Sequence, residues 1–338
     1  MTFLRSYTGA AWAALVFTLF VVLWGGFVSA SGAGDGCGDD WPLCGELLSP
    51  SAGATAADTA DTLVEFTHRA TSGLALLAVA GLAVWSRRRF PPGHPARWWA
   101  ALSLAFMVVE SLIGAALVLF QWVDMNVSLA RALVQPVHLA NTYFLMGALA
   151  CAAWWSGPRR PAATLDPGRP DRLVAAALGG LIVVSAFGTA ASLASTVFPS
   201  ESFLDGVRSD FAGGAHYLIR LRVWHPVAVV AFGAYLVWLG RRLRRMLPEP
   251  APLFPVAGVF AAELTVGVLD AVLLAPIALQ MAHLFLAHAL WLVLMALWLH
   301  LRSESAANVK RADATIEALR RELSTGGRRF TRDEMNAR

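Results

Sequence analysis

Four histidines stand at similar depth inside segments that are otherwise apolar enough to cross a lipid bilayer. His68 and His138 lie about six or seven residues inside two such segments, and His225 and His283 lie at similar places farther along the chain. At about 1.5 Å per helical residue, each imidazole would lie roughly 10 Å below one membrane surface. Two imidazoles that face each other across a helical bundle suit the ligation of a haem iron from both sides. The four residues therefore predict two bis-histidine haem sites.

Other interpretations of the histidines stay open. A single membrane histidine often hydrogen-bonds a neighbouring helix, although two pairs at equal depth argue against this for all four. Zinc needs more nitrogen, sulfur or carboxylate ligands at close spacing, and the sequence shows no such cluster. The other histidines stand in less suitable places: His94 in a loop, His216 at the start of a span, His288 off the helical face of His283, and His300 at a helix end.

Charged residues accompany the first histidine of the first pair. Glu65 lies three residues before His68 on the same helical face, and Arg69 follows directly. A carboxylate beside a haem can accept a proton or orient water, as hydroxylation requires, and an arginine can hold haem propionates. At the matching places around His225 stand Arg222 and a proline. The first half thus looks equipped for chemistry and the second for holding a redox haem, although Glu65 could simply pair with Arg69.

The elements that must position these residues are apolar blocks of about 20 residues, the length needed to cross a bilayer. The chain is 57% hydrophobic and only 15% charged, where a soluble domain has about a quarter charged residues. Because lipid cannot satisfy backbone polar groups, we expect an all-α polytopic membrane protein. Its eight spans are expected at about 10–30, 62–85, 98–120, 131–155, 172–193, 216–240, 252–275 and 278–301. The first is too long for a signal peptide and should be retained, and a tight turn near Pro276 should separate the last two.

The spans predict an internal duplication. ESLIG, with Glu110, matches ELTVG, with Glu263, and the two histidine pairs match in the same chain order. A looser match joins Val21–Gly26 to Val183–Gly188. Each copy would hold four spans, so the repeats are parallel and related by an axis along the membrane normal. We expect two four-helix bundles, residues 1–156 and 157–301, and a charged tail at 302–338 with a solvated helix at 316–323. The two glutamates should point inward and form hydrogen bonds, because charge in lipid is costly.

Basic residues gather in the connections on one side of the predicted spans, at 87–89, 159–160 and 241–245, and in the tail. By the positive-inside rule that side and both termini are cytoplasmic, in a plasma membrane. The loop at 31–61, with Cys37 and Cys44, then lies outside, where a disulfide is expected rather than two free thiols. The arginines are split among short loops, so no nucleic-acid partner is expected. Cys151 is expected to pack inside a helix bundle.

The motifs GCGDDWPLC (36–44), EFTHR (65–69) and VHLANT (137–142), with a second histidine pair in a duplicated half, resemble the haem A synthase family. The resemblance covers about residues 8–301. It implies that haem O, the substrate, lies between His68 and His138 and that His225 and His283 hold a haem b. It further implies that a ring methyl of haem O is oxidised to a formyl group by successive hydroxylations, for use in haem-copper oxidases. The implied partners are membrane lipid, haem O synthase, an electron acceptor and a second copy of the chain.

Within this resemblance, electrons would leave through the haem on His225 and His283, while Glu65 assists proton removal or water placement. Two rival functions remain. A non-enzymatic dihaem electron-transfer cytochrome fits the paired histidines equally well. A haem carrier would call for a tryptophan-rich outside loop, whereas the outside loops hold only Trp41 and Trp122. The cysteines either order the loop over the first site or pass reducing equivalents.

Overall fold

The computed structural model describes residues 6–38, 44, 55–157, 169–247 and 253–322, and the regular secondary structure in this part of the chain is all helical. The long helices are α1 (Tyr7–Ser31), α3 (Ala56–Arg89), α4 (Pro95–Leu119), α5 (Leu129–Ser156), α6 (Arg169–Val197), α9 (Trp224–Met246), α10 (Phe254–Val272) and α11 (Ile277–Glu322). The short ones are η2 (Ala33–Asp35), α7 (Phe203–Asp210) and α8 (Tyr217–Arg222). Eight helical segments within these ranges are long and apolar enough to cross a membrane, with α8 and α9 together forming the sixth. The predicted all-α polytopic membrane protein is confirmed.

Local sequence explains where the helices begin. Ser6 accepts a hydrogen bond from the backbone N–H of Gly9 and so caps α1. Thr55 and Asp58 form a reciprocal capping box at the start of α3. The tight turn predicted near Pro276 is present between α10 and α11, where Leu274 and Ala275 both have positive φ.

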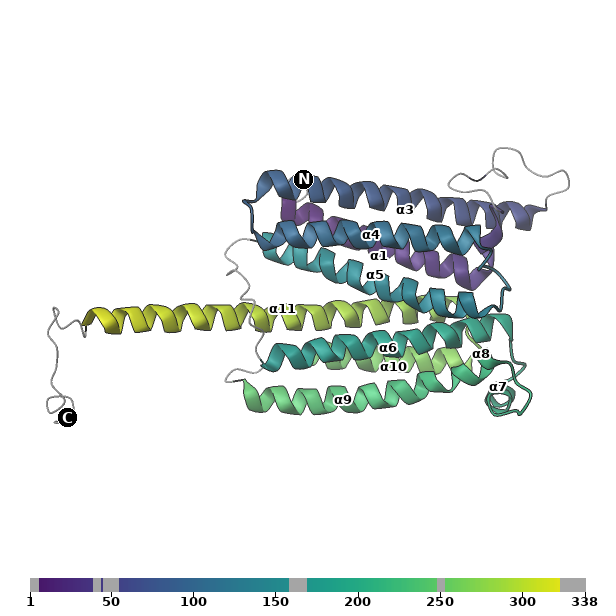
Figure 1. Cartoon of the computed structure of the whole chain (residues 1–338). Helices are drawn as coiled ribbons and strands as arrows, with labels where there is room; N and C mark the ends of the chain where they lie inside the picture. The colour runs from purple at the N-terminus through teal and green to yellow at the C-terminus, as the bar shows by residue number, and fades with distance from the viewer. Residues whose placement is uncertain (1–5, 39–43, 45–54, 158–168, 248–252, 323–338) are drawn as a thin grey trace.

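The long helices form two groups of four that lie side by side (Figure 1). In the first group, α3 and α5 each pack against both α1 and α4, so α3 and α5 stand diagonally across the bundle. In the second group, α6 packs against α9 and α11, and α10 packs against α11. The groups meet where α5 and α1 contact α11 and where α5 contacts α6. The predicted division after residue 156 falls at the end of α5, and the connection 158–168, with Arg159 and Arg160, lies outside the described residues.

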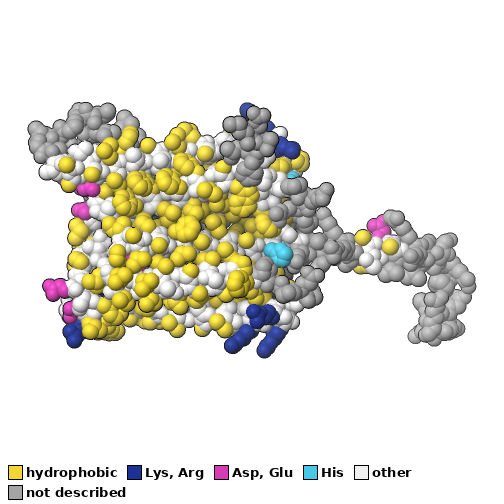
Figure 2. Space-filling view, turned by 180° about the vertical axis from the view of Figure 1, so that it is seen from behind, with side chains coloured by type: hydrophobic (Ala, Val, Ile, Leu, Met, Phe, Trp, Pro, Cys, Tyr) yellow, Lys and Arg dark blue, Asp and Glu magenta, His cyan; other side chains and the backbone are white. Residues whose placement is uncertain are grey.

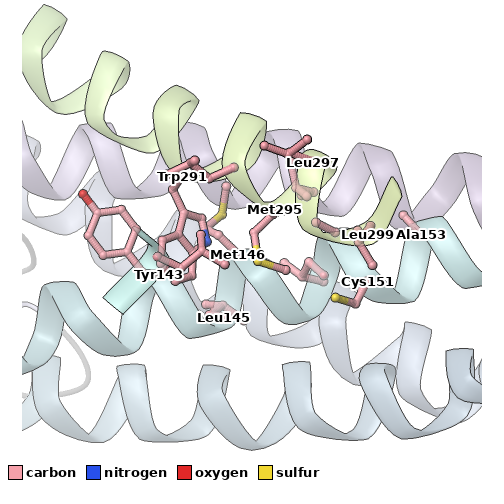
Figure 3. Close-up of a cluster of buried hydrophobic side chains, with 14 of the residues drawn as sticks. Tyr143, Leu145, Met146, Cys151, Ala153, Trp291, Met295, Leu297 and Leu299 are labelled. Carbon is pink, nitrogen blue, oxygen red and sulfur yellow. The ribbon is translucent and has the colours of Figure 1, made fainter. Parts of the chain in front are cut away.

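The core between the two groups is built mainly by α5 and α11. Figure 3 shows Tyr143 and Met146 of α5 clustered with Trp291 and Met295 of α11, all buried. Cys151 is fully buried nearby, as expected of a packing residue. This close packing makes α5 and α11 the rigid central wall of the molecule.

Two features differ in detail from the expected spans. The sixth span is divided at Val223 into α8 and α9, and the connection before it contains the helix α7. The last apolar span, Ile277–Ser303, ends close to the expected residue 301, but its helix α11 continues beyond the span to Glu322. The helix predicted at 316–323 is therefore, up to Glu322, the far end of α11, and residues 323–338 lie outside the described chain.

Charge divides the surface into two ends and a band between them. Figure 2 shows the apolar band with acidic side chains at one end and most Lys and Arg at the other. The basic end carries the exposed Arg87, Arg88 and Arg89 of α3 and Arg241, Arg244 and Arg245 of α9. The opposite, acidic end carries the exposed Asp58, Asp124, Glu201 and Asp205. Asp39, Asp40, Trp41 and Glu46 of the predicted outside loop lie outside the described residues.

Candidate functional site

The four predicted ligand histidines lie on diagonally placed helices of the two bundles. His68 is on α3 and His138 on α5, and their counterparts His225 and His283 are on α9 and α11. The rings of His225 and His283 lie edge to face, with centroids 6.2 Å apart and planes at 84°. The structure therefore brings the second predicted pair together in the interior of its bundle, and it places the first pair on the equivalent helices.

Glycines make room for three of the four imidazoles. A Cβ placed on Gly25 of α1 would lie 2.7 Å from Cε1 of His68. The same atom on Gly188 of α6 would lie 3.0 Å from His225, and on Gly267 of α10 it would lie 2.8 Å from His283. Real side chains do not pack so closely, so the rings lie against bare helix backbone. No Cβ clash arises at Gly114, the sequence match of Gly267.

These contacts correct the predicted repeat register in the first span. The sequence comparison matched Gly26 to Gly188, but Gly25 packs on the first histidine as Gly188 packs on the third. Gly26 faces Leu284 of α11 instead, where a Cβ would lie 2.4 Å from the leucine Cδ2. Because Gly25 and Gly26 are adjacent, the sequence allowed either one to match Gly188, and only the packing distinguishes the two alignments.

A hydrogen bond between a glutamine and a serine also repeats in the two halves. Gln135 of α5 donates to Ser29 of α1 at 3.3 Å, and Ser192 of α6 donates to Gln280 of α11 at 3.3 Å. Each glutamine lies three residues before a predicted ligand, His138 or His283. The duplicated arrangement around the sites thus extends beyond the histidines.

Three of the four Nδ1 atoms lie close to an acceptor. Nδ1 of His138 is 3.1 Å from Oε1 of Glu110, and Nδ1 of His283 is 3.2 Å from Oε2 of Glu263. Neither pair has the geometry of a hydrogen bond. Both Nδ1 atoms are buried and therefore lack a hydrogen-bond partner in this structure. Nδ1 of His225 is 3.2 Å from the carbonyl oxygen of Val184. The glutamates point inward as predicted; Glu110 is hydrogen-bonded by other residues, whereas Oε2 of Glu263 is not.

This arrangement fits a haem iron. Metal–nitrogen bonds of about 2 Å would put the centres of two imidazoles on one metal roughly 6 Å apart. The separation of His225 and His283 agrees with that value. Metal-binding histidines commonly direct the other ring nitrogen to a carboxylate or carbonyl, which leaves Nε2 for the metal. Within the described residues no cluster of three or more His, Cys, Asp or Glu is placed to hold a metal ion.

Glu65 pairs with Arg69, as one interpretation of the sequence allowed, and it also binds the backbone of Cys37, which the sequence did not indicate. Its Oε1 accepts from Nε and Nη2 of Arg69 at 3.0 and 2.5 Å, and its Oε2 accepts from the backbone N–H of Cys37 at 2.8 Å. Cys37 and Cys44 form the predicted disulfide, and both are buried. The carboxylate is only 3% exposed. Glu65 therefore connects the disulfide loop to α3. Arg69, which was predicted to hold a haem propionate, donates two of its N–H groups to Glu65.

Arg222 performs the matching task in the second half. Its guanidinium donates to Asp210 at 2.7 Å, to the carbonyl oxygen of Gly206 at 3.0 Å and to Ser209 at 3.1 Å. These partners lie in α7, the short helix in the connection between α6 and α8. The residue at the position of Glu65 thus has the opposite charge and again fastens a loop over the acidic end of its bundle.

The remaining histidines lie apart from the two pairs. His288 is fully buried between the bundles, with its ring centre 4.8 Å from that of Tyr143. The sequence did not single out Tyr143, although Tyr143 follows His138 by five residues just as His288 follows His283. His94 and His216 accept hydrogen bonds at the starts of α4 and α8.

Comparison with known proteins places this geometry in a family. Residues 9–295 match COX15-CtaA, described as cytochrome oxidase assembly protein. The chain belongs to this family. Two haem A synthases are similar over shorter stretches: that of Staphylococcus haemolyticus is 39% identical over 108 residues, 32% of this chain and 34% of the relative. That of Exiguobacterium sibiricum is 34% identical over 117 residues, 34% of this chain and 37% of the relative.

More extensive similarity joins the chain to larger family relatives. Proteins of two Thermus thermophilus strains, named protoheme IX farnesyltransferase, are 41% identical over 322 residues. The match covers 94% of this chain and 52% of each relative. The chain therefore spans about half the length of these curated relatives.

Hydrogen exchange can measure separately how Glu65 holds the Cys37 loop and how Arg222 holds α7. We expect Glu65→Leu to speed exchange of the Cys37 amide about tenfold or more, because losing the acceptor of a buried donor costs about 1–3 kcal/mol. Arg222→Leu should instead speed exchange within α7. Each variant is the control of the other when both are measured by mass spectrometry in detergent. Equal acceleration of both loops by either variant would contradict the assignment.

Proposed function

We propose that this chain is a haem A synthase, which oxidises a ring methyl of haem O to a formyl group with the help of a haem b. The observation that carries this proposal is the pair His225 and His283, whose ring centroids lie 6.2 Å apart in one bundle, and the equivalent placement of His68 and His138 in the other. Membership of the COX15-CtaA family and similarity to proteins named heme A synthase support it. Haem O is the substrate between His68 and His138, and haem b is held by His225 and His283.

The overall reaction defines what the chain must supply. Conversion of a methyl group and one water to a formyl group releases four electrons and four protons. When bound, haem b supplies a one-electron redox centre for passing electrons to an external acceptor. The chain's own residues hold both haems by their imidazoles, exclude lipid from the bundle interiors and receive protons at the acidic end. Glu65 is the carboxylate nearest in sequence to the substrate ligand His68 and is proposed to accept a proton or orient water.

The Thermus relatives support the proposed partner. Their name describes farnesyl transfer to protohaem, and the segment that matches this chain is about half of each protein. We propose that the farnesylated product is what this chain consumes, so an enzyme of that activity is its supplier. Farnesyl transfer by this chain itself is the second candidate, which the name of these relatives favours, and the function test below includes it.

The proposed orientation places the basic end in the cytoplasm and the disulfide loop outside. The exposed arginines at the ends of α3 and α9 support it, since such residues favour the cytoplasmic side. In intact cells, Phe211→Cys at the acidic end should react with a membrane-impermeant maleimide, and Arg88→Cys should react only after permeabilisation. The opposite labelling pattern would reverse the topology.

The role of Glu65 can be tested apart from its anchoring of the loop. Glu65→Gln keeps an oxygen that accepts from the Cys37 amide but removes the charge that binds a proton. We expect haem A output to fall roughly 10²–10⁴-fold, the usual loss with a general base, while exchange of the Cys37 amide stays near that of the wild type. Unchanged haem A output would leave Glu65 as an anchor alone.

The function itself is tested by haem extraction. The chain is expressed in a host that makes haem O and no haem A, and its haems are separated by chromatography with mass detection. We expect haem A or its hydroxylated precursor beside haem b. Haem b alone, with haem O available, would indicate an electron-transfer cytochrome. New haem O in a host that makes only haem b would indicate farnesyl transfer, and unaltered haem exported across the membrane would indicate a carrier.

A further inference from the structure

The carboxylate beside His138 is held by a network that fixes its position. Asn141 donates to Oε2 of Glu110 at 2.5 Å, and the hydroxyl of Thr142 donates to Oε1. Asn141 also donates to the carbonyl oxygen of Phe106, so its own amide is fixed to α4. Glu110 thus has two side-chain donors from α5 besides the nearby Nδ1 of His138, and all three come from one face of that helix.

The second half lacks this network. Glu263 stands at the place of Glu110 and approaches Nδ1 of His283 to 3.2 Å. The positions that match Asn141 and Thr142 in the repeat hold Leu286 and Ala287, which have no side-chain donors. Oε2 of Glu263 is accordingly buried without a hydrogen bond. Two sites of common design therefore differ in how firmly the carboxylate next to the ligand is held.

The difference has a physical consequence for the two histidines. A carboxylate fixed by donors from its neighbours is a stationary acceptor for the N–H of an imidazole, and it selects the tautomer in which Nδ1 carries the hydrogen. Nε2 is then the nitrogen available to a metal. A ligand oriented in this way before binding loses less conformational freedom when the metal arrives. A haem that stays bound orders its own ligands, whereas a haem that enters and leaves at every turnover benefits from a site that is already ordered.

We propose that Glu110, held by Asn141 and Thr142, is a positioning residue that orients His138 for a haem that exchanges, and that the second half lacks this network because its haem is resident. This inference rests on the proposed function, which assigns the substrate to the first half. It adds residues outside the ligand set and a reason for the asymmetry between the halves.

The test compares variants of the full chain, purified in detergent from a host that makes haem O and haem b. Glu110→Leu should weaken retention of the first-site haem roughly 10–100-fold, the usual effect of removing a partner of a metal-binding histidine, and leave haem b at the second site in place. Glu263→Leu is the matched control and should affect only haem b. The double variant N141L/T142A copies the residues of the second half and should give a smaller loss in the same direction as Glu110→Leu.

The measurements are haem O and haem b per chain and the low-spin ferric signals in electron paramagnetic resonance. Glu110→Gln is included because it still accepts from Nδ1 but carries no charge. It should keep haem O and shift the signal and midpoint potential of the first haem. If Glu110→Leu retains haem O with a wild-type signal, the inference is overturned. If Glu110→Leu fails to fold while Glu110→Gln matches the wild type in signal and potential, Glu110 is only structural and the inference is again overturned.

The same samples separate this inference from the proposed function. Wild-type chain that carries haem b and no haem O, or whose haem O is unaffected by His138→Ala, would overturn the proposed function and the inference together. Wild-type chain that needs His138 for haem O but not Glu110 would overturn the inference alone.

Discussion

Inside a bilayer, an imidazole must find both its packing space and its hydrogen-bond partner within the protein, and much of this structure follows from that requirement. Space comes from glycines on neighbouring helices, Gly25, Gly188 and Gly267, which let a ring lie against bare backbone. The nearest acceptors are the carbonyl oxygen of Val184, beside His225, and two glutamates that would be costly if they faced lipid and that lie within 3.2 Å of His138 and His283. The helices that carry these groups must therefore stay in register with the helices that carry the histidines.

The two loops at the acidic end are also fastened from within the bundles. Glu65 and Arg222 occupy equivalent positions close to a predicted ligand histidine, and each reaches a loop over its own bundle. Their charges are opposite, and their loop partners differ accordingly: Glu65 accepts from the backbone N–H of Cys37, whereas Arg222 donates to Asp210 and to the carbonyl oxygen of Gly206. The two halves thus share the position of the residue that holds the loop, whereas the charge of that residue differs.

Hydropathy and helical spacing were sufficient to predict the eight spans and the inward glutamates, because these depend on composition and on helical geometry. Two cysteines in one loop were sufficient to predict the disulfide. Tertiary contacts decided the rest. The choice between Gly25 and Gly26 depends on which backbone meets His68, and the break at Val223 depends on how α7 and α8 fold over the second bundle. Likewise, the bond from the Cys37 amide to Glu65 joins a loop to a helix 28 residues away, and no periodicity indicates it. The ligand roles of the four histidines stay a prediction.

The central wall gives the two sites a common support. One histidine of each pair is on an outer helix, α3 or α9, whereas the other is on α5 or α11, which pack together at the junction. Five residues beyond each inner histidine, Tyr143 and His288 stack at that junction, and Tyr143 also bonds Ser185 of α6 at 2.9 Å. Because this contact is fully buried, a shift of α5 that moved His138 would disturb the packing that holds α11 and His283. The two sites can therefore differ in their polar surroundings while their inner ligands keep a fixed relation to each other.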